Sequence, residues 1–220
     1  MRGRVKMYRK TVLVALVLAA VMAVPGVASA DPASSGRGER HRSPRHHLPK
    51  PPASAHADIA PSTAGGSGSG TNTISFGNFD SGDICVVLGT LTGHAGVFDG
   101  SYYHGYLSDK AMLSANTTPV SGVQREPLSK YRAYPDAYGL WVPSVTAAKR
   151  TAARDFARAQ LGEPYVINAS KTNDAAWYCS KLAWAGYRRT SGIDLDADGG
   201  YFVWPVDLLN DPATYVFAAG

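Results

Sequence analysis

The stretch AWYCSKLAWAGYRR, residues 176–189, puts Cys179 at the start of a helical pattern. Cysteine occurs only twice in the 220 residues, the other being Cys85 in an apolar run. The unpaired N–H groups and the positive dipole end of a helix N-terminus favour a thiolate and can also stabilise an oxyanion. Cys179 is therefore a candidate nucleophile. A disulfide with Cys85, or a small buried hydrophobic role, is the alternative.

Outward from this helix, strands and helices occupy separate blocks of the chain. We expect strands at residues 82–89, 93–100, 111–116 and 138–143, the first two joined as a hairpin. From Ser144 the apolar period becomes helical, with basic residues on the outer face, and Gly162 and Pro164 end that helix. Segregated blocks predict an α+β fold, an antiparallel sheet packed against helices. The last apolar segments, 201–209 and 214–219, are expected to add to the core or the sheet edge.

The chain begins with features typical of export. Residues 1–30 have a basic start, an apolar run and a small-residue end, which predicts a secretory signal peptide cleaved after Ala30. The apolar run is shorter than the roughly 18–20 residues of a bilayer-spanning helix, although a retained signal anchor is the alternative. Residues 31–70 are rich in Ser, Pro, Gly, Arg and His, which predicts a disordered linker. We expect a secreted protein, extracellular or cell-wall associated, with a folded domain at 71–220.

The basic charge of the chain is concentrated before that domain. Of 22 basic and 17 acidic residues, 10 and 3 precede Thr71, leaving 12 against 14 in the domain. A near-neutral domain does not support a nucleic-acid-binding face. The basic linker can instead hold the protein near a polyanionic cell wall or a membrane surface. We expect a monomer.

A thiol nucleophile needs a general base, and the domain holds only His94 and His104. His94 lies between Gly93 and Ala95 at the start of a predicted strand, where small neighbours leave its ring approachable. His104 lies in a loop of Tyr and Gly and is interpreted as a surface residue. His94 is therefore the candidate base, and a histidine satisfied by the core is the alternative.

Four motifs occur in an informative order: GDICVV (82–87), GHAGVF (93–98), GEPY (162–165) and YCSKLAW (178–184). In this order they resemble the YiiX/YebB-like branch of the NlpC-type cysteine hydrolases, over about residues 80 to 210. That branch is circularly permuted relative to papain, so the histidine strand precedes the cysteine helix. The resemblance implies a permuted papain-like fold. The order of the motifs is more specific than any one motif alone.

The resemblance implies roles for particular residues. It makes Cys179 the nucleophile and His94 the base. Relatives often carry a Glu on the strand after the histidine strand, in a context like VIEA; here MLSA puts Ser114 at that position, with Asn116 next on the same face. Either could bond the imidazole, but a serine has no charge to stabilise an imidazolium. Tyr165, at an aromatic position that borders the cleft in the family, and Tyr178 are expected to bind substrate.

The resemblance also implies the chemistry. Cys179 would attack an amide carbonyl and form a thioester, and His94 would protonate the leaving group and activate water. We expect peptidoglycan stem peptides as the substrate and no cofactor. The alternatives are a lipid or ester acyl hydrolase or acyltransferase of the same fold, and a non-catalytic, disulfide-linked wall-binding domain.

The stretch DLDADGG, residues 194–200, raises the question of a metal. Asp194, Asp196 and Asp198, followed by Gly199, match the first half of a calcium loop. The position of the bidentate Glu is Pro205, so the match fails there. We therefore expect an Asp- and Gly-rich turn and no metal ligands.

Overall fold

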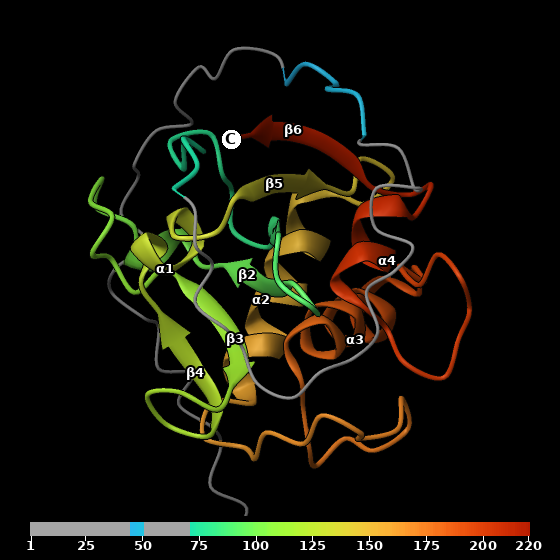
Figure 1. Cartoon of the computed structure of the whole chain (residues 1–220). Helices are drawn as coiled ribbons and strands as arrows, with labels where there is room; N and C mark the ends of the chain where they lie inside the picture. Colours follow the sequence, from blue (N-terminus) through green and yellow to red (C-terminus); the bar gives the residue numbers. More distant parts are fainter. Residues whose placement is uncertain (1–44, 51–70) are drawn as a thin grey trace, which may run out of the picture. The chain divides into compact units, whose positions relative to one another are not determined.

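A six-stranded antiparallel sheet organises the chain, in the order β4-β3-β2-β1-β5-β6 (Figure 1). The computed structural model describes residues 45–50 and 71–220. The strands are β1 Ile84–Leu88, β2 His94–Phe98, β3 Met112–Asn116, β4 Gly122–Glu126, β5 Asp136–Trp141 and β6 Tyr215–Ala219. The helices are the 3-10 turn Gly100–Tyr102, α1 Leu128–Arg132, α2 Ala147–Ala159, α3 Cys179–Ser191 and α4 Pro205–Asn210. The predicted α+β class is confirmed, as is the hairpin of β1 and β2.

The central strand β1 is buried on both faces, which explains its unbroken apolar sequence. Ile84, Val86 and Leu88 belong to a core shared with α2, α3 and α4. Cys85 and Val87 point the opposite way, into a second core formed with α1 and the segment 74–79. The helices α2 and α3 lie together on the first face (Figure 1). Side chains at the strand ends can therefore meet residues from either layer.

The helix boundaries follow local sequence signals. The Thr146 side chain accepts a hydrogen bond from the Lys149 N–H and caps α2. Gly192, in the left-handed conformation (φ +78°), ends α3. Residues 201–209 form a loop and then α4, because Pro205 is suited to the first turn of a helix. Strand β6 lies at the sheet edge as expected, whereas β4, α1 and α4 were not predicted.

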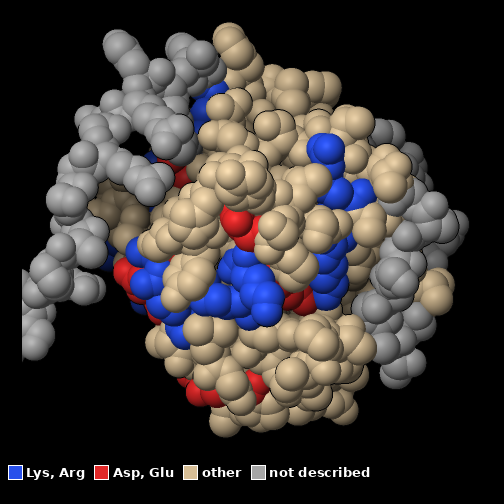
Figure 2. All heavy atoms as spheres, turned by 90° about the vertical axis from the view of Figure 1, so that its left-hand side faces the viewer, with Lys and Arg blue, Asp and Glu red and all other residues tan. Residues whose placement is uncertain are grey.

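A buried carboxylate joins β2, β4 and α2. Asp99 is fully buried and pairs with Arg125 (2.9 Å), Arg154 (2.8 Å) and Arg158 (2.7 Å). Arg154 is itself buried, so the prediction that the basic residues of α2 all face outward is wrong. The reason is that Asp99 needs charged partners once it is removed from water. Figure 2 shows Lys and Arg gathered near the middle of one face, with acidic side chains between them.

Residues 45–50, which lie within the stretch 31–70 predicted to be a linker, contact the domain. The guanidinium of Arg45 donates to both carboxylate oxygens of Asp83, at 3.1 and 2.7 Å. The main chain of Leu48 pairs with the edge strand β6. A buried acidic partner and an open strand edge give these residues contacts that composition alone does not reveal.

The predicted signal peptide and the rest of the linker fall outside the described residues. They remain predictions of the sequence. Within residues 45–50 and 71–220, no helix has the length and apolar character needed to cross a membrane.

Candidate active site

Strand β2 and helix α3 bring His94 and Cys179 together. Gly93 turns the chain into β2 with φ +64°, and a Cβ there would lie 2.6 Å from the carbonyl oxygen of Val87. His94 follows as the first residue of β2, and Cys179 is the first residue of α3. The Cys179 sulfur is hydrogen-bonded by the His94 imidazole and by the Ala95 N–H. Both cysteines are free, so the structure excludes the predicted alternative of a Cys85–Cys179 disulfide.

The two groups shift each other's protonation. Burial alone would raise the pKa of the Cys179 thiol, but the charge and hydrogen bond of His94 outweigh it and lower that pKa. Burial opposes the charged form of His94 as well, but the charges of Glu126 and Cys179 raise its pKa to about 9. The two shifts together favour a thiolate beside an imidazolium.

The carboxylate beside the imidazole comes from β4. The Oε2 atom of Glu126 lies 2.8 Å from His94 Nε2, and both side chains are almost fully buried. Ser114 also reaches the ring: its Oγ is 3.3 Å from Nε2 while its hydroxyl donates to the Ala95 carbonyl at 2.6 Å. Because Nε2 faces Glu126 and Ser114, Nδ1 is the ring nitrogen left for the sulfur.

Glu126 is held by three further donors. Asn116 Nδ2 donates to Oε1 at 2.8 Å, the Tyr131 hydroxyl donates to Oε2 at 2.8 Å, and Lys130 Nζ pairs with Oε1. Burial would raise the pKa of Glu126, but His94 and Lys130 hold it well below its usual range. Asn116 therefore contacts Glu126: among the described residues its amide bonds the carboxylate rather than the imidazole. It lies two residues beyond Ser114 on the same face of β3.

Gly96 makes room for this arrangement. A Cβ at Gly96 would lie 2.1 Å from the hydroxyl oxygen of Tyr131. The absence of a side chain in the middle of β2 therefore lets the Tyr131 hydroxyl lie against the strand and donate to Glu126. The His94 ring also packs against two tyrosines, Tyr131 and Tyr134, at centroid distances of 5.5 and 6.5 Å.

Glu126 was missed because the expected carboxylate position, on β3, holds Ser114. The register pairs Ser114 with Gln124 and Met112 with Glu126, so Glu126 shares a face with Ser114 from the neighbouring strand. One signal could have found it: Glu126 and Glu163 are the two glutamates of residues 71–220. A glutamate next to a strand that already carries a polar face is a natural candidate partner for a histidine.

Cys179 and His94 open onto a pocket with an empty volume of about 350 Å³. The predicted substrate-binding residues Tyr165 and Tyr178 both line it, together with Asn116. Its remaining aromatic and apolar lining includes Ile167, Trp204 and Pro205. His104 is exposed and lies beside Asp109, and it does not line this pocket.

A cysteine at a helix N-terminus, beside a histidine on a strand that comes earlier in the chain, defines the class of permuted papain-like cysteine hydrolases. The chain belongs to the family described as permuted papain-like amidase enzymes, YaeF/YiiX, C92, whose model matches residues 76–199. The predicted family and fold are thus confirmed.

Two individual proteins are similar to the chain. The uncharacterized protein YycO of Bacillus subtilis (strain 168) is 33% identical over 119 residues, which cover 51% of this chain and 48% of YycO. The chain thus spans about half the length of this relative. The crystal structure of metalloprotein YiiX from Escherichia coli O157:H7 has a TM-score of 0.45 and 14% identity, over 62% of this chain and 95% of that chain.

Proposed function

We propose that this protein is an exported cysteine amidase that cleaves amide bonds in peptidoglycan stem peptides. Cys179 is the nucleophile, His94 the acid and base, and Glu126 the residue that orients the imidazole and stabilises its charge. The observation that carries the proposal is the pairing of Cys179 with His94, whose Nε2 lies 2.8 Å from Glu126. A buried carboxylate at this distance supplies the charge that Ser114 lacks.

The reaction follows from the protonation states. The Cys179 thiolate attacks the amide carbon, and N–H groups at the start of α3 stabilise the oxyanion. The His94 imidazolium gives its proton to the leaving amine, the C–N bond breaks, and a thioester remains. Neutral His94 then takes a proton from water, which attacks the thioester. The C–S bond breaks, the carboxylic acid leaves, and the thiolate–imidazolium pair is restored.

Two features support the choice of substrate. The export signal predicted at residues 1–30 would bring the enzyme to the compartment where peptidoglycan lies. The pocket beside Cys179 and His94 is lined by Tyr165, Tyr178 and Trp204, and aromatic rings of this kind can border a short peptide.

The lining favours a second candidate, an N-acyl or ester bond of a lipid. Apart from the Cys179–His94 pair, the described residues that line the pocket include no charged side chain, and Ile167, Trp204 and Pro205 are apolar. Such a wall would accommodate an acyl chain as readily as a small peptide.

Mass spectrometry of products separates the candidates. The full chain, its Cys179→Ala variant and Cys85→Ala, which removes the other thiol, are incubated with muropeptides and with membrane lipids. New amine and carboxyl ends in muropeptides, formed by the wild type and Cys85→Ala but not by Cys179→Ala, would support the proposal. Fatty-acid release in the same pattern would support the lipid candidate, and equal products from Cys179→Ala would refute the mechanism.

A further inference from the structure

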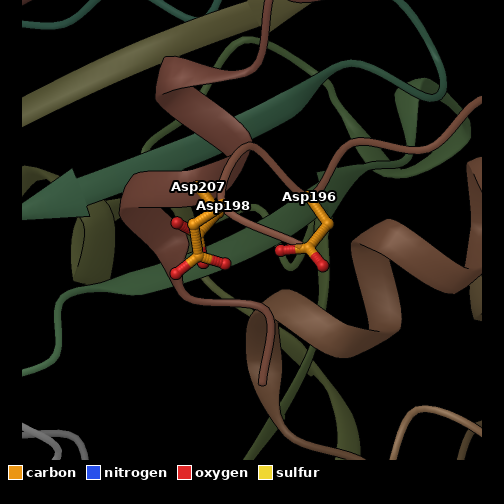
Figure 3. A group of neighbouring side chains, drawn as sticks. All are labelled: Asp196, Asp198 and Asp207. Carbon is orange, nitrogen blue, oxygen red and sulfur yellow. The ribbon is translucent and has the colours of Figure 1, made fainter. Parts of the chain in front are cut away.

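Three carboxylates converge away from the Cys179–His94 pair. One oxygen each from Asp196, Asp198 and Asp207 lies within 4.8 Å of the others (Figure 3). Asp196 and Asp198 belong to the DLDADGG loop, and Asp207 comes from α4. The linear calcium pattern fails at Pro205, but the first turn of α4 brings in Asp207 two residues later. The fold thus supplies an acidic ligand that the spacing in the sequence did not predict.

One of these carboxylates has an oxygen that nothing satisfies. The Asp196 side chain is 3% exposed, and its Oδ1 has no hydrogen-bond partner within the described part of the chain. In Figure 3 the Asp196 carboxylate faces those of Asp198 and Asp207. A buried carboxylate oxygen without a donor is costly, and a bound cation at this point would satisfy it.

The charges of the cluster are not balanced. Lys171 Nζ pairs with Asp196 and also contacts the carbonyl oxygen of Gly200. No other ion pair to the three carboxylates is formed within residues 45–50 and 71–220. One ammonium against three carboxylates leaves two negative charges. The Lys171 ammonium therefore lies between Asp196 and the Gly200 carbonyl.

We propose that Asp196, Asp198 and Asp207 bind one Ca²⁺ ion. Carboxylate and carbonyl oxygens are the ligands of a hard cation. Ca²⁺ binds oxygen at about 2.3–2.6 Å, so oxygens on opposite sides of it lie about 4.6–5.2 Å apart. Mg²⁺ would require a tighter set, about 4.0–4.2 Å across. Water molecules complete the coordination.

This arrangement differs from the linear calcium loop at its first position. The side chain of Asp194 lies outside the cluster, because its Oδ1 accepts a hydrogen bond from Trp184 Nε1 at 2.7 Å. The ligands are therefore the second and third aspartates of the motif and a residue of the following helix.

The ion would fix one wall of the catalytic pocket. Between the ligands Asp198 and Asp207 lie Val203, whose N–H donates to the Tyr178 hydroxyl at 3.0 Å, and the pocket residues Trp204 and Pro205. The Val203 carbonyl accepts a hydrogen bond from the Ser180 hydroxyl at 2.6 Å, next to Cys179. The role of the ion is therefore structural: it holds the loop 199–204 against the start of α3.

Terbium luminescence and thermal unfolding test the proposal without depending on activity. The chelator-treated full chain is titrated with Tb³⁺ under tryptophan excitation, because Trp184 lies beside the loop. We expect sensitised emission that Ca²⁺ displaces more readily than Mg²⁺. Ca²⁺ at about 100 times its Kd should also raise the thermal midpoint by about 5 °C or more.

Variants make the outcome specific. Asp198→Asn, at an exposed residue, and Asp196→Asn should both lose the emission and the thermal shift. Asp136→Asn, an exposed aspartate on β5, should keep both. The proposal is overturned if the wild type gives neither signal, or if Asp198→Asn and Asp196→Asn respond like the wild type. Binding only after Lys171→Gln would also overturn it, because Lys171 would then be the resident cation.

Discussion

The two cysteines lie in two regions that shift the pKa of the thiol in opposite directions. Cys85 is in the middle of β1, fully buried among apolar residues, and burial raises the pKa of its thiol far above the usual value. Cys179 is also taken out of water, at the start of α3, and burial again acts to raise its pKa. There, however, His94 lies beside the sulfur and reverses the shift.

The comparison locates the source of reactivity. Burial is common to both thiols, so it cannot be what activates Cys179. The difference is a charged partner, and that partner is itself kept charged by Glu126, because the pKa of His94 rises to about 9. The proposed reactivity of Cys179 therefore depends on the carboxylate of Glu126, which acts on the sulfur indirectly, by keeping the imidazole of His94 charged.

The largest expected effect on activity is that of removing the Cys179 thiol, with Cys85→Ala as the comparison. Cys179→Ala should lower kcat/KM by on the order of 10⁴-fold or more, since it removes the atom that forms the thioester. Cys85→Ala should keep the activity and cost about 1 kcal/mol of stability from the lost apolar contact. Steady-state kinetics and chemical denaturation measure the two. Equal losses of activity in both variants would contradict the comparison.

Alkylation compares the same two thiols in the unmodified protein. Iodoacetamide at neutral pH should modify Cys179 orders of magnitude faster than Cys85, because only Cys179 has a lowered thiol pKa and lines the pocket. Peptide mass spectrometry after timed quenching reports both sites. Comparable rates under native conditions would show that the environments do not differ as described.

Glu126→Gln should remove the negative charge beside His94 while keeping a side chain of nearly the same size and shape. We expect kcat/KM to fall by roughly 10²–10⁴-fold, as for other buried carboxylates that orient a catalytic histidine. In the wild type, activity should fall as pH rises through the pKa of His94, at about 9. Glu126 raises that pKa, so the alkaline limb of the variant should move to lower pH.

Glu163→Gln is the matched control for that variant. Glu163 is the other glutamate of the domain, and its carboxylate contacts the Trp177 indole rather than His94. Its pH profile should keep the alkaline limb of the wild type. A limb that does not move in Glu126→Gln would show that Glu126 does not set the charge of His94.

Gly96→Ala tests the packing behind the carboxylate. The added methyl would lie 2.1 Å from the Tyr131 hydroxyl, so the ring must shift away from Glu126. We expect a loss of about 1–3 kcal/mol in unfolding free energy and a smaller loss of activity than in Glu126→Gln. Thermal or urea unfolding together with kinetics checks both. A fully stable and fully active variant would argue against this contact.

Ser114→Ala should have the smallest effect. Its Oγ makes a neutral contact with His94 Nε2 at 3.3 Å, longer than the contact with Glu126. A neutral hydrogen bond contributes about 0.5–1.5 kcal/mol, so kcat/KM should fall by roughly two- to tenfold. A loss as large as that of Glu126→Gln would make Ser114 the more important partner.

The parts of the fold that could be predicted are those encoded locally. The β-branched run of β1, the small residues around His94 and the Gly192 stop of α3 all lie within a few residues of the structure they determine. The positions of Cys179 and His94 at the starts of α3 and β2 followed from the same local patterns.

Glu126 could not be found in this way, because its place depends on which residues β3 and β4 set opposite each other. Its other partners, Lys130 and Tyr131, lie on α1, a helix of five residues with little periodicity. The burial of Arg154 depends likewise on Asp99, 55 residues earlier in the chain. Long-range pairing, rather than composition, decides these contacts.

The origin of the carboxylate on β4 bears on how such chains are classified. A search that demands an acidic residue on the strand directly after the histidine would discard this sequence as a degenerate homologue, because Ser114 stands there. Yet neighbouring strands of one sheet can present a side chain to the same point in space. A homologue judged inactive only because an aligned position lacks the acidic residue can therefore carry that carboxylate on the neighbouring strand.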